Sequence, residues 1–320
     1  MLSENLRQRL ERLNRESLPA VRGDVAPPRA APPMNRGVVL SPSAQAASAS
    51  TLPGEVAIAA SAEHWLIRQD VAALWPRFDA RIDAGRCASA ERVEPIPFTR
   101  PSARSRRHAM EIAALAAAFP RDAMFLDLET CGLAGSMVFL IGLVRHDGES
   151  LVVEQLLARN YAEEQAILGA LWQRAAEATL LVTFNGKSFD WPLVQYRSTY
   201  HRIAASDSAS SLAHVDVLHH ARRRWRERLP DCRLQTLERF LCRRHRSGDI
   251  PGREIPEAYR QYVATGRVDQ MQAILHHNAL DLITLVELSM LLTAEGDPTH
   301  VANSAERRND EFPIFNEEAA

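Results

Sequence analysis

The spacing of hydrophobic and polar residues changes character near residue 122. From there, apolar runs of strand length alternate with short turns. The apolar runs are 123–129, 137–145 and 151–158, and the turns between them are 132–136 and 147–150. Short loops between successive strands predict an antiparallel meander.

Helical spacing dominates the chain after this meander. Residues 162–178 place Ile167, Leu168, Leu171 and Ala175 on one face, which predicts a helix. The next elements are a strand at 179–184, apolar enough to lie inside a sheet, a helix from about Ser188, a possible strand at 214–218, and helices around 217–228, 233–243, 255–265 and 268–293. Antiparallel strands followed by alternating helix and strand predict an α/β fold, a mixed sheet flanked by helices.

The upstream part of the chain has weaker patterns. Residues 1–14 have leucines at helical spacing, and the chain from there to residue 53 is rich in Ala, Pro, Ser and Arg, typical of a disordered linker. A helix is expected at 108–119, but residues 54–98 have no clear period. The predicted organisation is a short helix plus linker at 1–53, an extension of uncertain structure at 54–121, an α/β domain at 122–294 and a flexible tail at 295–320.

Composition narrows the class of protein. The chain has 320 residues, of which 46% are hydrophobic, so it can bury a substantial core. The longest apolar run, around 137–144, is far shorter than the ~18 to 20 residues of a membrane helix. The first residues mix acids and arginines where a secretory signal has an apolar stretch. We therefore expect a cytoplasmic protein with no membrane partner. The cysteines, which form no C-x-x-C pair, should be free thiols: Cys87, Cys131, Cys232 and Cys242.

Two carboxylates interrupt the first strand of the α/β domain. Asp127 and Glu129 are two residues apart in an apolar run, so both side chains lie on the same face of the strand. Burying like charges together is costly unless a hard divalent cation lies between them, or unless the pair faces water. The pattern alone leaves both interpretations open.

A third acid follows a turn. Asp190 lies in the first helical turn after the Asn185-Gly186 dipeptide that ends a buried strand. It could simply interact with the helix dipole. It could also overhang the strand ends, where ligands collect in open α/β sheets.

The last predicted helix, 268–293, carries two polar residues on its apolar stripe. His277 and Asp281 are four residues apart and share one face. The histidine could be an ordinary satisfied core or surface residue, but an aspartate on that face needs a partner. Four acids and a histidine therefore indicate a candidate site for Mg²⁺ or Mn²⁺.

Positive charge is concentrated in one region although the net charge is only −2. Ten arginines lie between residues 222 and 246, against three acids. Arg222, Arg223 and Arg226 surround a helical face that contains Trp225. The helix could have a solvated face, or it could form a basic wall for a nucleic-acid backbone.

Three polar residues near the predicted strand ends have two interpretations each. Asn185 could close its turn or contact a phosphate. Lys187, the single lysine of the sequence, could contact a phosphate or have no special role. Asp216 could be a fifth acid near the site or a helix cap.

The motifs occur in an order that resembles a known superfamily. "FLDLETCGL", "FNGKSFD", "VDVLHHARRRWRERLPDCRLQTLE" and "HHNALDLITL" resemble the DEDD exonucleases on the ribonuclease H-like fold, and more narrowly the YprB-type ribonuclease H-like family of bacteria. The resemblance covers about residues 122 to 294. One departure is Cys131, which stands where this superfamily often has a threonine.

The resemblance implies a metal-dependent nuclease acting on DNA or RNA, expected to be a 3′ to 5′ exonuclease. Asp127, Glu129, Asp190 and Asp281 would bind two Mg²⁺ or Mn²⁺ ions, and a histidine would activate the attacking water. Spacing leaves His276 and His277 as candidates. Helical geometry favours His277, at about 40° from Asp281 around the axis, over His276 at about 140°. The alternatives are a noncatalytic nucleic-acid-binding scaffold and a structure-specific endonuclease.

Overall fold

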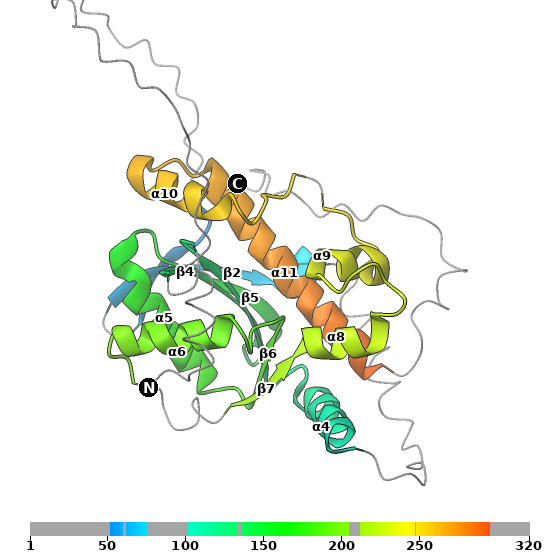
Figure 1. Ribbon diagram of the computed structural model, residues 1–320. Coiled ribbons are helices and arrows are strands. Elements are labelled where there is room, and N and C mark those ends of the chain that lie inside the picture. The colour runs from blue at the N-terminus through cyan, green and yellow to red at the C-terminus, as the bar shows by residue number, and fades with distance from the viewer. Residues whose placement is uncertain are drawn as a thin grey trace, which may run out of the picture. The chain divides into compact units, whose positions relative to one another are not determined.

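The computed structural model describes residues 52–59, 62–75, 102–132, 136–204, 212–246 and 248–294 (Figure 1). The predicted helix at 1–14, nearly all of the predicted linker, the predicted tail and Cys87 lie outside the described residues.

A seven-stranded mixed sheet forms the centre of the described chain. Its strand order is β1-β2-β5-β4-β3-β6-β7. The bounds are β1 Glu55–Ala59, β2 Ala62–Asp70, β3 Ala123–Thr130, β4 Val138–His146, β5 Leu151–Leu157, β6 Leu180–Thr183 and β7 Ala213–Asp216. β3, β4 and β5 pair antiparallel, as the meander predicts, while β6 runs parallel to β3 and β7 parallel to β6. The predicted α/β class with a mixed sheet is confirmed.

The first two strands lie where the sequence shows no clear period. β2 pairs with β5 and β1 with β2, so both extend the antiparallel edge of the sheet. Val56 and Ile58 are 49% and 73% exposed, because β1 is the outermost strand. The hairpin buries only Ala59 and Ile67 of its apolar residues, too few to form a regular alternating pattern in the sequence. The sheet therefore starts upstream of the boundary predicted at residue 122.

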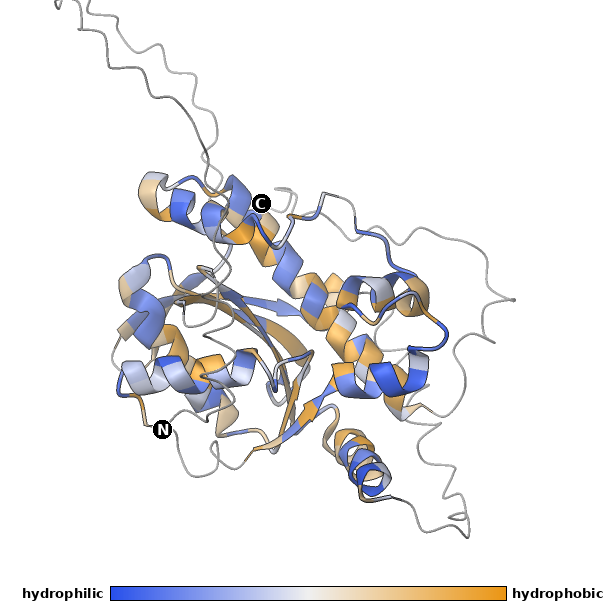
Figure 2. Cartoon of the chain, in the orientation of Figure 1, coloured by the Kyte–Doolittle hydropathy of each residue, from blue (hydrophilic) through white to orange (hydrophobic). Residues whose placement is uncertain are grey.

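Helices pack on both faces of the sheet (Figure 1). Met124 and Leu126 of β3 face one core, which includes residues of α5, whereas Phe125 faces the other, which includes residues of α4, α8 and α11. The central strands and much of α11 consist of hydrophobic residues (Figure 2). The helical bounds are α2 Val71–Leu74, α4 Ala103–Ala118, η1 Tyr161–Glu163, α5 Glu164–Ala175, α6 Asp190–Tyr200, α8 Val217–Trp225, α9 Leu234–Leu237, η2 Glu238–Cys242, α10 Ile255–Thr265 and α11 Asp269–Thr293.

Some helix ends differ from the predicted ones for identifiable reasons. The helix predicted at 108–119 begins earlier, because the Ser102 hydroxyl caps α4 by accepting from the Ser105 N–H at 3.1 Å. The helix predicted at 233–243 is divided into α9 and a π-helical segment, η2. Three of the four cysteines are described, and all three are free thiols as predicted. No helix in the described ranges is long and apolar enough to span a bilayer.

Candidate functional site

β3 presents the first two acids on the face covered by α11. Strand side chains alternate, so Asp127 and Glu129 lie on the same side as Phe125, which is buried in the core beside α11. α11 packs directly against β3. The Glu129 side chain keeps 13% of its surface exposed, so the acid remains reachable from outside. The strand therefore places two carboxylates beneath a helix without sealing them off.

The turn between β6 and α6 places the third acid. Asn185 has φ of 66°, a left-handed conformation that asparagine tolerates in tight turns. Its N–H donates to Asp216 Oδ1 at 2.8 Å, and the Lys187 N–H donates to Asp216 Oδ2 at 3.2 Å. Asp216 also accepts from the Leu218 N–H and so caps α8. Asp216 therefore has both roles that the sequence suggested. It caps α8, and its charge acts on Asp190, which is the first residue of α6.

α11 supplies the remaining two predicted residues. His277 is 7% exposed, and its Nε2 lies 3.5 Å from Asp281 Oδ2 and 3.9 Å from Glu129 Oε1. The histidine therefore bridges the helix acid and a strand acid, so of the two candidate histidines His277 is the one placed against the carboxylates.

The charges of Asp281, Glu129 and Asp190 all act on the protonation of Asp127, so these three acids lie within electrostatic range of it. The pKa of Asp127 is raised well above its ordinary value by burial, and further by the negative charges of Asp281, Glu129 and Asp190. Burial raises the pKa of Glu129 to about 8 although His277 opposes the rise, and raises that of Asp190 to about 7. Burial also raises the pKa of Asp281 despite the nearby charges of Arg246 and His277. We call these four acids the carboxylate site.

This donor set suits a hard divalent cation. Carboxylate oxygens are the ligands that Mg²⁺ and Mn²⁺ prefer, and a cation would compensate the negative charge that burial makes costly here. As the side chains stand, no group of three or more His, Cys, Asp or Glu residues in the described part of the chain is arranged to hold one ion. Two of the acids are instead held by groups of the protein itself.

Asp127 is held by an amide that the sequence pattern did not single out. Asn278 Nδ2 donates to Asp127 Oδ2 at 2.8 Å, and Asn278 Oδ1 accepts from Gln155 Nε2 at 2.9 Å. Gly142 lies between Asp127 and Gln155 across the three strands, and a Cβ there would come within 2.1 Å of Asn278 Oδ1. Gly142 thus leaves the space that lets the α11 amide reach the strand acid. Two features of the sequence could have indicated this contact. Asn278 is a polar residue inside an apolar helix, and Gly142 is a glycine inside a strand.

Asp281 and His277 are held by a second group that the sequence pattern did not single out. Asp249 Oδ1 lies 2.7 Å from His277 Nδ1, and Asp249 Oδ2 accepts from Arg246 Nη1 at 3.2 Å. Arg246 also donates to Asp281 Oδ1 and, through Nε at 2.6 Å, to Glu238. Burial works to lower the pKa of His277, but the hydrogen bond with Asp249 and the charges of Asp281 and Glu129 outweigh it and raise the pKa. The segment before α10 therefore fixes the histidine and one acid together.

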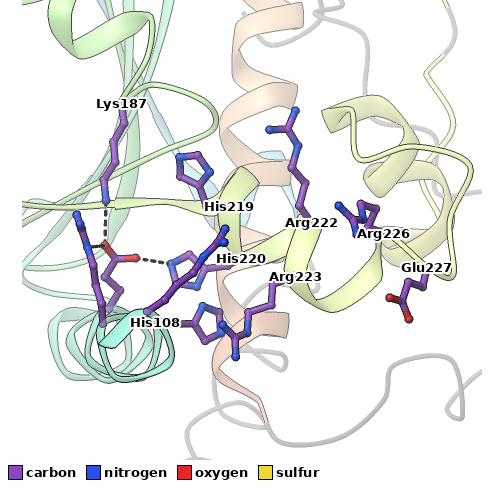
Figure 3. A pocket seen from close by; sticks show the side chains of 11 residues that line it. His108, Lys187, His219, His220, Arg222, Arg223, Arg226 and Glu227 are labelled. Atoms are coloured by element: carbon purple, nitrogen blue, oxygen red, sulfur yellow. Dashed lines mark hydrogen bonds and ion pairs between the residues drawn. The ribbon is translucent and has the colours of Figure 1, made fainter. Parts of the chain in front are cut away.

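The residues predicted to bind substrate lie beside the carboxylate site. Lys187, Arg222, Arg223 and Arg226 line a hollow of about 720 Å³ between α4 and α8 (Figure 3). None of the four acids lines this hollow. Asn185 closes the turn that precedes α6 and does not line the hollow. The hollow and the carboxylate site are therefore separate, and the β6–α6 turn connects them.

Comparison with known proteins finds similarity over the part of the chain that builds the carboxylate site. A family model described as RNase_H superfamily matches residues 124–293. The uncharacterized protein YprB of Bacillus subtilis (strain 168) is 34% identical over 167 residues, which is 51% of this chain and 40% of YprB. The match thus spans less than half of that relative's length.

Two solved structures show weak likeness. A family B DNA polymerase from the archaeon Pyrobaculum calidifontis aligns with a TM-score of 0.45 and 16% identity over 54% of this chain and 24% of the polymerase. The EXO domain of Aedes aegypti Nibbler aligns with a TM-score of 0.28 and 16% identity over 60% of this chain and 89% of that domain. At these TM-scores neither likeness bears on function.

Proposed function

Because this chain belongs to the RNase_H superfamily, we propose that it is a metal-dependent nuclease that hydrolyses nucleic-acid phosphodiesters, acting as a 3′ to 5′ exonuclease of the DEDD type. The observation that carries the proposal is the convergence of Glu129 and Asp281 on the His277 imidazole, with the charges of both acids and of Asp190 acting on Asp127. These residues come from β3, α6 and α11, so only the folded chain assembles them.

The four acids would hold two Mg²⁺ or Mn²⁺ ions. Asp127, on whose protonation the charges of the other three acids act, would hold the ions together with Glu129, Asp281 and Asp190. When bound, such ions neutralise the carboxylates and stabilise charge on the attacking and leaving oxygens of a phosphodiester. Asn278 would keep Asp127 in a fixed orientation through its 2.8 Å hydrogen bond.

The His277 imidazole would take the proton of the attacking water. Its Nδ1–H donates to the Asp249 carboxylate, which leaves Nε2 as the proton acceptor on the side of Glu129 and Asp281. Asp249 would act as a positioning residue, because it selects the tautomer and fixes the ring.

A substrate panel tests the proposal. Purified full-length protein is incubated with labelled single-stranded DNA, single-stranded RNA and duplexes, with Mn²⁺, with Mg²⁺ or with chelator. We expect cleavage with the ions and none with chelator, and products that shorten from the 3′ end. Internal cuts at a junction would indicate an endonuclease instead. Tight nucleic-acid binding without cleavage on any substrate would indicate the noncatalytic scaffold.

Replacing Asp249 tests the positioning role. Asp249→Asn should lower kcat by about tenfold to a hundredfold and leave KM within about twofold, because substrate contacts persist while the His277 ring loses its fixed tautomer. Asp249→Glu should recover most of the activity, and Asp231→Asn, which changes a half-exposed acid outside the site, should have no effect. If kcat is unchanged in Asp249→Asn, or if KM alone rises, Asp249 does not act through His277.

A further inference from the structure

The hollow between α4 and α8 is a second place where the chain concentrates charge, and it is basic. Glu111 and Glu227 are its acidic lining residues in the described part of the chain. The arginine and lysine residues that line it are Arg104, Arg107, Lys187, Arg222, Arg223 and Arg226. Hence cationic groups face one another across a space of about 720 Å³.

Glu111, one of these two acids, connects helix α4 to the rest of the domain by ion pairs. Glu111 Oε1 lies 3.0 Å from Lys187 Nζ, and Glu111 Oε2 lies 2.9 Å from His220 Nε2. The His108 ring stacks on His220 with centroids 4.4 Å apart, and Leu115 is buried in the core. Two helices far apart in the sequence are therefore held at a fixed separation (Figure 3).

Four of the five arginines that line the hollow have no ion pair among the described residues, whereas Arg107 Nε pairs with Glu111 Oε1 at 3.3 Å. Within the described ranges, Arg104, Arg222 and Arg226 form no ion pair, and all three are exposed. Arg223 donates to the Ser105 hydroxyl at 3.4 Å, an interaction that neutralises no charge. Arginine forks match phosphate oxygens in geometry as well as charge, and a polyanion would relieve the repulsion among them. The complementary chemistry is thus a row of phosphates.

The hollow adjoins the carboxylate site through the β6–α6 turn. Lys187 reaches into the hollow, and Asp190, three residues later, belongs to the carboxylate site. Asp216 accepts from the Lys187 N–H and raises the pKa of Asp190, so these groups lie close together. A strand with its end at the acids could continue past Lys187 into the hollow. α4 itself precedes residue 124, where the family match begins.

We propose that α4 and α8 together bind the phosphates of a polynucleotide strand whose end lies at the carboxylate site, so that the protein prefers chains longer than a few nucleotides. This inference rests on the proposed nuclease function. The α4 residues Arg104 and Arg107 are its distinguishing elements, because they lie outside the part of the chain that matches the family.

Binding in chelator tests the hollow without any cleavage. The affinity of full-length protein for a labelled single strand is measured over a range of salt concentrations. Arg104→Gln/Arg107→Gln should weaken binding about tenfold and reduce the salt slope by roughly 1.4, twice the about 0.7 expected per phosphate contact on a single strand. Arg222→Gln/Arg226→Gln should do the same. The matched control is Arg253→Gln/Arg267→Gln, which removes two exposed arginines outside the hollow.

Two outcomes would overturn the proposal. One is binding by the α4 double variant within twofold of wild type with an unchanged slope. The other is displacement of the strand by polyglutamate as effectively as by unlabelled nucleic acid, which would indicate an acidic protein partner. Because chelator prevents cleavage, either result is independent of whether the wild type is a nuclease.

A cleavage measurement completes the test. In wild type, kcat/KM should be higher for a long strand than for a trinucleotide, and the α4 double variant should lose most of that preference. If wild type cleaves both lengths equally, the hollow does not extend the substrate site. If wild type cleaves neither, the proposed function fails, and the binding result stands alone.

Discussion

Replacing Asp127 with asparagine should abolish cleavage without destabilising the protein. Asp127 lies among three other carboxylates, so its loss should reduce activity about a thousandfold, equivalent to roughly 4 kcal/mol of lost transition-state stabilisation. The same change removes one of the mutually repelling buried charges, so the Tm in chelator should stay level or rise. Activity is measured by product release from a labelled strand and Tm by thermal unfolding.

Measuring both activity and Tm distinguishes a catalytic role of Asp127 from a role in folding. Asp122→Asn is the matched control, because it changes an exposed acid just before β3 and should alter neither measurement. Wild-type cleavage by the Asp127 variant would exclude the carboxylate site as the reaction centre. Lost activity together with a sharply lowered Tm would mean that Asp127 supports the fold rather than the chemistry.

The sequence was sufficient to predict the sheet wherever strands are buried. β3, β4, β5 and β6 are apolar runs, and the antiparallel pairing of β3, β4 and β5 follows from loop length, whereas the parallel pairing of β6 with β3 does not. The α/β class and the YprB-like ribonuclease H-like resemblance are confirmed by the sheet and the family match. β1 and β2 were not predicted, because they bury few apolar residues and are held in the sheet mainly by the pairing of β2 with β5.

The charged members of the site were predictable, whereas the residues that orient them were not. Asp127 and His277 stand out because each interrupts an apolar stripe. Asn278, Gly142 and Asp249 act only through partners far along the chain, such as the 151 residues that separate Asn278 from Asp127. Tertiary packing determines which residues form such a hydrogen bond, so it cannot be predicted from the spacing of residues along the chain. The catalytic roles and the metal sites of the acids stay predictions.

Stability in chelator should fall as the pH rises from 6.5 to about 8. The folded-state pKa of Glu129 is about 8 against an ordinary 4.5, and that of Asp190 about 7 against 3.8, so unfolding releases protons in this range. A group whose pKa is raised by folding contributes stability that is lost as the pH rises through the folded value. The raised pKa of His277 acts in the same direction.

The pH range is chosen to exclude histidines that act in the opposite direction. Folding lowers the pKa of His108 and His214 to about 4 from 6.5, so they favour the folded state increasingly as the pH rises, but only up to about 6.5. Above that pH their effect fades, because the unfolded-state histidines lose their remaining protons within about one pH unit. The acids of the carboxylate site then dominate the slope of Tm against pH.

Adding Mn²⁺ should reduce or reverse that slope. An ion that binds only the folded state stabilises it by mass action, and it binds more tightly once the acids are ionised at high pH. The Tm at pH 8 should therefore rise more with Mn²⁺ than the Tm at pH 6.5, whereas added Na⁺ at equal ionic strength should leave this difference unchanged. Glu129→Gln should flatten the slope of Tm against pH in chelator.

A Tm that does not fall with pH in chelator would mean that the four acids do not share one buried volume. If the Tm falls with pH and Mn²⁺ does not raise it, the four acids are buried together but do not bind the metal ion.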